Sequence, residues 1–268
     1  MSKVDAVILA GAPAGGLAPT AEGGRGSCRA MSRAMIPIAG KSMLAWVVEA
    51  LRGAASVGRI AVVGNITDGP GSPEPGPSGV DLVVEPGGNL MENIKRGIEA
   101  LEPEGPVLIV CSDVPLLTAE AVDDFVERAA KLDVDLAYPI IPRAHCEARY
   151  PGIKRTYLKT GDGVFTGGNI MLVRAEFVFR NWGTVSNAYA ARKQVFKLAR
   201  MIGMGVLARV LAARVFPGVL RLAMIERAAG KMLGARVAAV VSAYPEIGED
   251  VDKPSDLEAV ERLLGSPR

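Results

Sequence analysis

Short apolar runs alternate with segments of helical spacing along most of this chain. The runs are rich in β-branched residues and end at glycine or polar residues, which is typical of buried strands. We expect strands at 4–10, 59–63, 81–84, 107–111, 135–138 and 236–241, and helices at 43–52, 91–101, 118–131 and 256–264. This alternation predicts an α/β fold with a mostly parallel sheet and helices on both of its faces.

Composition excludes several classes of function. The 268 residues are 49% hydrophobic and carry a net charge of +2, so a sizeable core is expected and nucleic acid is not an expected partner. Three cysteines without a short spacing suggest neither a disulfide framework nor a zinc site, and the single histidine, His145, excludes a centre of several histidines. We interpret His145 as a polar surface or loop residue. The apolar run at 6–10 is too short for a signal peptide or a membrane span, so we expect a cytoplasmic protein.

A glycine-rich segment follows the first expected strand. Residues 11–32 contain six glycines and two prolines, and Arg25 and Arg33 add positive charge. Backbone N–H groups of such a loop can approach phosphate oxygens, so a polyphosphate is the ligand that we expect; a flexible surface loop is the alternative. A P-loop is excluded, because that motif needs glycine at the position of Met35.

Acidic residues follow two of the expected strands. Asp113 comes directly after the apolar run 107–111, where a carboxylate would face a ligand crevice and could bind a divalent cation; a turn or helix-capping role is the alternative. Asp250 and Asp252 follow the last strand and would share one face of an extended segment. One of the two could meet Asp113 across a Mg²⁺ ion.

Five motifs in order resemble those of the nucleotidyltransferases similar to the enzymes of molybdenum cofactor biosynthesis, the MobA-like NTP transferase domain. The motifs occupy 7–11, 33–41, 111–115, 166–169 and 250–257, and the resemblance covers about 4–175 and 236–264. It implies the Rossmann-like three-layer α/β sandwich that sugar-nucleotide pyrophosphorylases and cytidylyltransferases share. It also implies a single domain over 1–268, with a basic helical insertion at about 180–235.

The resemblance further implies the site residues. Those expected to bind the nucleotide are Leu9, Ala10, Gly11, Ala12, Gly15, Gly16, Arg25, Arg33, Gly87, Gly88 and Asn93. Those expected to line the acceptor side are Thr166, Gly167, Gly168 and Asn169. Asp113 and Asp252 would bind Mg²⁺, with Asp250 as the alternative ligand, and Arg33, Asp113 and Asp252 would carry the catalysis. Two positions depart from the family: Ala12 replaces a glycine, and Arg33 replaces a lysine.

These residues lead to a hypothesis of function. The protein would be a Mg²⁺-dependent nucleotidyltransferase that transfers a nucleoside monophosphate from a nucleoside triphosphate, CTP or GTP, to a phosphorylated acceptor and releases pyrophosphate. A glycosyltransferase that uses a sugar nucleotide is one alternative, although the Asp-x-Asp typical of that class is absent at 111–113. A non-catalytic nucleotide-binding module is the other.

The segment from Arg180 to Arg236 is strongly basic, with eleven Lys+Arg and a single acid, Glu226. Helices are expected at 187–213 and 219–233, and a basic stripe at Lys193, Lys197 and Arg200. The stripe could be an ordinary solvated surface, a cap that attracts an anionic and partly apolar acceptor, or a peripheral contact with anionic lipid. Apolar helices in this segment could also pair between subunits of a homo-oligomer.

Overall fold

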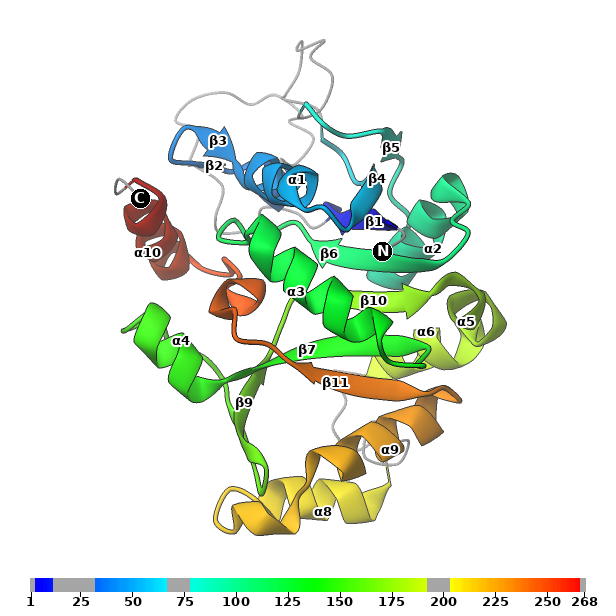
Figure 1. The fold of residues 1–268 in the computed structure, drawn as a ribbon, viewed down its shortest axis with the longest axis vertical. Helices are drawn as coiled ribbons and strands as arrows, with labels where there is room; N and C mark the ends of the chain where they lie inside the picture. Colours follow the sequence, from blue (N-terminus) through cyan, green and yellow to red (C-terminus); the bar gives the residue numbers. More distant parts are fainter. Residues whose placement is uncertain (1–2, 12–31, 67–77, 192–202, 266–268) are drawn as a thin grey trace, which may run out of the picture. The chain divides into compact units, whose positions relative to one another are not determined.

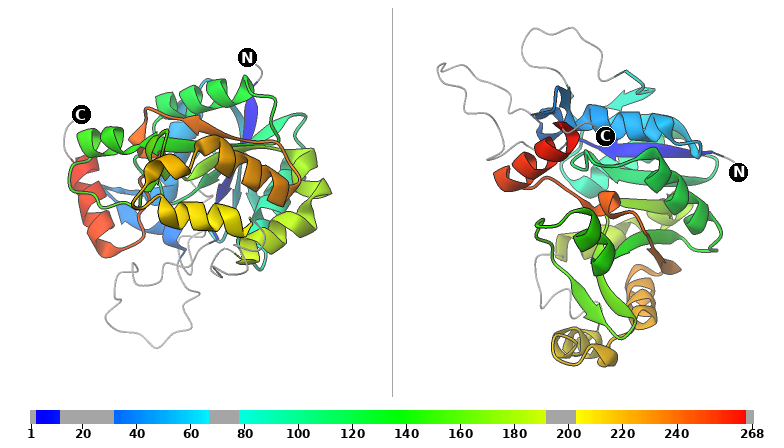
Figure 2. Two further views of the ribbon diagram at one scale, coloured as in Figure 1. Left: turned by 90° about the horizontal axis from the view of Figure 1, so that it is seen from below. Right: turned by 60° about the vertical axis from the view of Figure 1, so that its left-hand side comes forward.

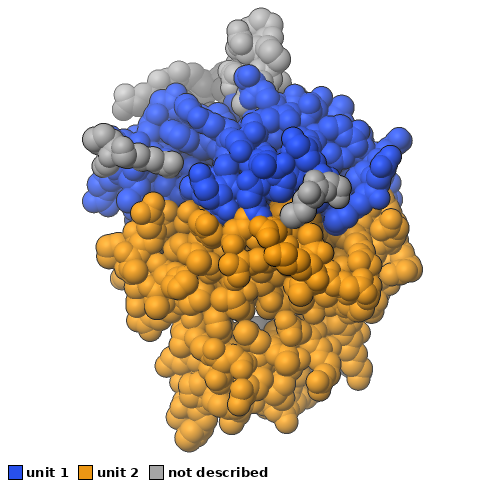
Figure 3. Space-filling model, in the orientation of Figure 1, with its two compact units in different colours: residues 1–123, 249–268 blue, residues 124–248 orange. Residues whose placement is uncertain are grey.

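The computed structural model describes residues 3–11, 32–66, 78–191 and 203–265. The chain divides into two compact units, unit 1 with 1–123 and 249–268 and unit 2 with 124–248 (Figure 3). Strands alternate with helices as predicted, so the α/β class is confirmed (Figure 1). Within the described ranges no helix has both the length and the apolar character needed to cross a membrane.

Unit 1 contains four parallel strands in the order β5-β4-β1-β6. Their bounds are Val4–Leu9 for β1, Val57–Val63 for β4, Leu82–Val84 for β5 and Pro106–Cys111 for β6. Each agrees with an expected strand to within three residues at either end. Leu9 pairs in register with Val63 on one side and Cys111 on the other, so β1, β4 and β6 end together. The segments that follow β1 and β6 therefore start from the same edge of the sheet.

Helices α1 (Met43–Gly53) and α2 (Leu90–Leu101) pack on this sheet. Figure 1 shows α1 in front of the strands and α2 behind them, and Figure 2 gives two further views of both. Side chains cap the helices as their sequences suggest: Ser42 accepts a bond from Ala45 N, and Asn89 accepts one from Glu92 N. Helix α3 (Ala119–Ala130) begins in unit 1, and the Thr118 hydroxyl accepts from Ala121 N as the predicted N-cap. Helix α10 (Pro254–Gly265) closes the chain.

Gly97 allows α2 to lie directly against the sheet. A Cβ atom at this position would overlap Val7 Cγ1 and lie 3.0 Å from Val63 Cγ2, and both valines are fully buried. We therefore expect Gly97→Ala to lower the free energy of unfolding by about 1–3 kcal/mol, the range for an overpacked core, in spite of the better helix propensity of alanine.

Denaturant unfolding measures this effect, with Gly105→Ala as the control. A Cβ at Gly105 meets nothing within 4 Å, so this change should be neutral or slightly stabilising. Equal unfolding midpoints for the two variants would contradict the close packing of α2.

Unit 2 is built around β7 (Leu136–Pro142), and here the mostly parallel pattern gives way to mixed pairing. Strand β11 (Val237–Val241) pairs with β7 in parallel, but β9 (Gly163–Gly167) and β10 (Ile170–Arg174) pair with it antiparallel. Strand β8 (Leu158–Thr160) forms an antiparallel hairpin with β9. Its turn includes Gly161 and Asp162, and Gly163 has φ +143°, which glycine adopts readily.

Two helices of unit 2, at 143–149 and at 175–180, were not expected. Residues 143–149 form α4 (Arg143–Arg149), which carries the exposed His145. This segment lacks a regular apolar spacing, since Cys146 is its only buried residue. The surface position predicted for His145 is thus confirmed, and its element is a helix instead of a loop.

Short elements complete the two units. Unit 1 also contains η2 (Arg33–Met35), β2 (Pro37–Ile38) and β3 (Lys41–Ser42), and unit 2 contains α5 (Ala175–Arg180) and η4 (Pro245–Gly248).

The basic segment is helical, but it is broken more often than expected. It forms α6 (Trp182–Ala191), α8 (Met204–Ala212), the short η3 (Pro217–Val219) and α9 (Leu222–Leu233). Helix α8 begins after Gly203, whose φ of +103° is not helical, so the expected helix 187–213 is not continuous. The stripe of Lys193, Lys197 and Arg200 lies outside the described residues.

Candidate active site

A single guanidinium nitrogen of Arg33 contacts two of the predicted acids. Arg33 Nη1 lies 2.6 Å from Asp252 Oδ1 and 3.3 Å from Asp113 Oδ2. Asp113 follows β6, Asp252 precedes α10, and Arg33 opens η2. Three segments that are distant in sequence therefore converge at one point of unit 1.

Main-chain contacts hold this arrangement in place. The Val251 N–H donates to the Asp113 carbonyl oxygen at 2.9 Å, and the Val251 side chain is fully buried. This bond fixes the residue before Asp252 next to the end of β6. Pro254 then starts α10 at a position where the missing N–H has no cost. The acids are thus placed by backbone geometry, and Arg33 joins them.

The electrostatic balance at this point is negative. Burial is the main cause that raises the pKa of Asp113 to about 6, and the charge of Asp250 adds to it, whereas Arg33 acts in the opposite direction. Burial together with Asp113, Asp250 and Asp252 also raises the pKa of the Cys111 thiol to about 12. Cys111 is therefore protonated at neutral pH and is no candidate nucleophile. One arginine does not compensate these acids, so the cluster favours additional positive charge.

The donor set fits a hard divalent cation of the magnesium type. Magnesium commonly takes one or two carboxylates from the protein and completes its shell with water and phosphate oxygens. Asp113 and Asp252 are two such carboxylates, and Asp250 lies close enough to influence Asp113. No group of three or more His, Cys, Asp or Glu able to hold a metal occurs among the described residues. Arg33 Nε is buried and has no hydrogen-bond partner among the described residues.

The segment around Gly87 is attached to the start of α2. Asn93 Oδ1 accepts a hydrogen bond from Gly87 N at 2.6 Å, and the Asn93 side chain is buried. A Cβ at Gly11 would come 2.7 Å from Asn93 Nδ2, so glycine is needed there for close approach. The structure thus brings together Gly11, Gly87 and Asn93, three of the residues predicted to bind the nucleotide. Because Asn93 Oδ1 is engaged by Gly87, Asn93 is suited to shaping this loop.

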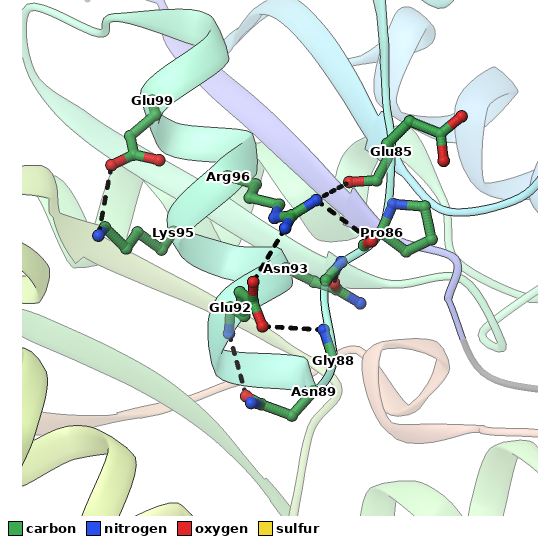
Figure 4. Close-up of polar contacts among 10 residues, drawn as sticks. Glu85, Pro86, Gly88, Asn89, Glu92, Asn93, Lys95, Arg96 and Glu99 are labelled. Atoms are coloured by element: carbon green, nitrogen blue, oxygen red, sulfur yellow. Dashed lines mark hydrogen bonds and ion pairs between the residues drawn. The ribbon is translucent and has the colours of Figure 1, made fainter.

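A second set of contacts on α2 was not predicted. Glu92 accepts from Gly88 N at 2.8 Å, and Arg96 donates to Glu92 and to the carbonyl oxygens of Glu85 and Pro86 (Figure 4). The bond from Gly88 is the main cause that lowers the pKa of Glu92, so this carboxylate is ionised at neutral pH. The signal was present in the sequence, because Asn89 and Glu92 have the spacing of a capping box.

The predicted acceptor-side residues lie in unit 2, while the acids lie in unit 1. Tyr138 donates its hydroxyl to the Gly168 carbonyl oxygen at 2.7 Å, and Gly168 N donates to Pro139 O. A Cβ at Gly167 would lie 2.5 Å from Tyr138 Oη, so packing requires glycine there. Asn169 is bonded to η4 through Ile247 O and Gly248 O, and Thr166 is buried. Tyr138, which sequence reasoning missed, is the side chain that holds this turn.

The remaining predicted nucleotide-binding residues divide into two sets. Leu9 and Ala10 are buried at the end of β1, and Ala10 N donates to Val63 O. The other set lies outside the described residues: Ala12, Gly15, Gly16 and Arg25.

An α/β fold with acids at the carboxyl end of its parallel strands is characteristic of nucleotide-binding enzymes. The chain belongs to the family described as the MobA-like NTP transferase domain, whose model matches residues 21–224. The protein is therefore an enzyme of the nucleotidyltransferase class. The predicted family, fold class and enzyme class are confirmed.

Solved structures resemble the chain over nearly its whole length. A hypothetical transferase from Thermus thermophilus is 36% identical with a TM-score of 0.78, covering 95% of this chain and 99% of the other. The 2-C-methyl-D-erythritol 4-phosphate cytidylyltransferase from Thermus thermophilus is 16% identical with a TM-score of 0.51, covering 96% of each chain. A CMP:2-keto-3-deoxy-manno-octonic acid synthetase complexed with CTP is 13% identical with a TM-score of 0.55, covering 98% of each chain. The last two likenesses concern the fold alone. No curated protein matches the chain.

Proposed function

We propose that this enzyme transfers a nucleoside monophosphate from a nucleoside triphosphate, CTP or GTP, to a phosphorylated acceptor in a Mg²⁺-dependent reaction. The observation that carries the proposal is the convergence of Asp113 and Asp252 on one nitrogen of Arg33. Two carboxylates and a guanidinium at the end of parallel strands suit the binding of a cation and a triphosphate.

The chemistry asks little of the protein beyond charge and position. An anionic oxygen of the acceptor phosphate would attack the α-phosphorus in line, the bond from that phosphorus to its bridging oxygen would break, and pyrophosphate would leave. Such an acceptor is already ionised at pH 7, so no general base is required. The Arg33 guanidinium would oppose the negative charge that develops on the phosphate oxygens.

Asp113 and Asp252 are the residues that would hold Mg²⁺, with Asp250 as the alternative to Asp252. The bound ion would supply charge neutralisation at the phosphates. The three acids carry more negative charge than the single Arg33 neutralises, so a bound cation would be attracted to them.

Cytidine is the nucleoside that we favour. Of the structures with the same fold, one is named a cytidylyltransferase, another a 4-diphosphocytidyl-2C-methyl-D-erythritol synthase, and a third is named as complexed with CTP. Their names also suggest that the acceptor is a small anionic molecule. GTP stays the second candidate.

Pyrophosphate release tests the proposal. The enzyme is incubated with CTP, GTP, UTP or ATP and a panel of phosphorylated acceptors, with Mg²⁺ or with EDTA. We expect turnover with CTP or GTP that requires Mg²⁺, and thermal stabilisation by the same triphosphate through mass action. Triphosphate binding without turnover would favour a non-catalytic module, and turnover with a sugar nucleotide alone would favour a glycosyltransferase.

A further inference from the structure

Unit 2 contains an apolar cavity of about 350 Å³ under α9. One wall is the apolar side of α9, which includes Leu222, Ile225 and Leu233, and the opposite walls come from β7, β11 and the β8–β9 hairpin. Figure 1 shows α9 and β9 on the two sides of this region, and Figure 3 shows a hollow in the surface of unit 2 in the same orientation. Among the described residues that line the cavity, Glu226 is the only charged one. The volume falls in the range of small-molecule sites.

Polar contacts hold α9 in its position. Asp162 of the hairpin accepts from Leu222 N at 2.7 Å and from Arg221 Nη1 at 3.1 Å, at the start of the helix. Glu226 accepts from Ala239 N of β11 at 2.8 Å. The one acid of the basic segment thus anchors α9 to β11 through Oε1.

The apolar side of α9 nevertheless stays incompletely packed. None of the twelve residues of α9 is buried, and of the five residues of β11 only Val240 is. An amphipathic helix gains stability when its apolar side is buried. Helix α9 is held above the sheet with its apolar side only partly covered, so space is left there for another apolar group. This space is the cavity.

A basic pocket of about 370 Å³ adjoins the apolar cavity. Both pockets are lined by Leu158, Phe165, Thr166 and Gly167, so they share the wall formed by the β8–β9 hairpin. The basic pocket adds Lys159 and Arg214, which are exposed and form no ion pair with any described residue. An apolar space therefore lies next to two cations that have no anionic partner within the described part of the chain.

We propose that unit 2 binds an amphiphilic organic phosphate, with its apolar chain in the cavity under α9 and its phosphate near Lys159 and Arg214. This inference rests on the proposed function, because it assigns the phosphorylated acceptor to a chemical class: a monophosphate ester of an aliphatic chain. Thr166 and Gly167, predicted to line the acceptor side, belong to the wall common to both pockets. Neither charge nor apolar surface alone would select such a molecule, whereas the two adjacent pockets together do.

Titration calorimetry of the full chain with butyl, hexyl and octyl phosphate tests the proposal. No nucleotide is added, so the result does not depend on whether nucleotidyl transfer takes place. We expect the Kd to fall roughly fourfold for each added methylene that enters the cavity, which follows from about 0.8 kcal/mol per buried methylene. 1-Octanol, which lacks the phosphate, should bind at least about tenfold more weakly than octyl phosphate.

Variants of α9 separate the cavity from other apolar surface. Ala229 lines the cavity, whereas Ala223 lies on the same helix and does not. Ala229→Phe should therefore abolish the dependence of the Kd on chain length, and Ala223→Phe should preserve it. Double charge reversal, Lys159→Glu with Arg214→Glu, should raise the Kd of all three alkyl phosphates by the same factor. Arg227→Glu changes a residue of α9 that lines neither pocket and should leave all three Kd values unchanged. Circular dichroism and thermal unfolding check that each variant is folded.

Three results would overturn the proposal. The first is an equal Kd for butyl and octyl phosphate in the folded wild-type protein. The second is a dependence on chain length that Ala229→Phe leaves intact, since the chain would then bind elsewhere, for example on the exposed apolar residues Val215 and Phe216. The third is a Kd for octyl phosphate that stays the same after the charge reversal of Lys159 and Arg214.

Discussion

Asp113→Asn is expected to lower kcat/KM for nucleotidyl transfer by about 10²–10³-fold, the range found when one preorganised electrostatic group is removed from an active site. The substitution keeps the shape of the side chain but removes the charge that faces Arg33 at 3.3 Å. It also removes one of the two carboxylates proposed to hold Mg²⁺. Pyrophosphate release with saturating Mg²⁺ measures the loss, and Glu127→Gln, which removes an exposed acid paired with Lys131 near the end of α3, is the matched control.

The same variant should not lose stability. Folding raises the pKa of Asp113 from 3.8 to about 6, so ionisation of this carboxyl lowers the stability of the folded protein. The loss of stability grows as the pH rises from 3.8 to about 6 and is complete above that range. Asparagine removes a penalty of at most about 3 kcal/mol at neutral pH. EDTA removes bound metal, which would otherwise stabilise the wild type alone. At about pH 7.5 in EDTA we therefore expect Asp113→Asn to melt at the wild-type temperature or above, and we expect the two melting temperatures to lie closer together near pH 4. Loss of activity together with a lower melting temperature would point to misfolding.

Arg33→Ala is expected to reduce both activity and stability. Without the guanidinium, Asp113 and Asp252 lose the cation that contacts both, and activity should fall by about 10²–10³-fold. The pKa of Asp113 should rise further, because Arg33 acts to lower it. The melting temperature should therefore drop most at pH 8 and least at pH 5, where Asp113 takes up a proton.

Two comparisons make this prediction specific to Arg33. Arg33→Lys keeps the charge but offers a single ammonium in place of a planar fork, so we expect an intermediate loss of about tenfold. Arg128→Ala, which removes an arginine paired with Asp124 on the surface of α3, should leave activity unchanged. Mg²⁺ should raise the melting temperature of Arg33→Ala more than that of the wild type, since the ion then replaces the missing charge. A variant that is fully active would show that the bridge between the acids is dispensable.

Strands and helices with a clear apolar period could be predicted from the sequence. The run 107–111 contains only apolar residues and matches β6, and Thr118 caps α3 as its sequence indicates. The β8–β9 hairpin was missed because only two residues, Gly161 and Asp162, carry its turn, although glycine next to aspartate is a known hairpin signal. Helix α4 was missed because its exposed side dominates its composition.

The residues of the site could be predicted from the sequence, but their arrangement in space could not. Asp113 could be found because it follows a buried strand, whereas Asp252 depended on a family resemblance. The ion pairs from Arg33 to Asp113 and Asp252 span 80 and 219 positions of sequence, and no local pattern encodes contacts at such separations. Tyr138 falls in the same category, because it acts through the carbonyl oxygen of Gly168, 30 positions away, which only the folded chain places beside it. Glu92 differs, because its bond to Gly88 N is local and its spacing from Asn89 could have been noticed in the sequence.

The contact between Glu226 and Ala239 N also covers part of an open sheet edge. Among the described strands β11 pairs with β7 alone, so its other side is a sheet edge of the kind that recruits strands from neighbouring molecules. The carboxylate of Glu226 occupies one N–H group of that edge, and α9 shields it. We therefore expect a shortened enzyme without 180–235 to leave this edge uncovered and to associate more readily with other copies than the full chain does.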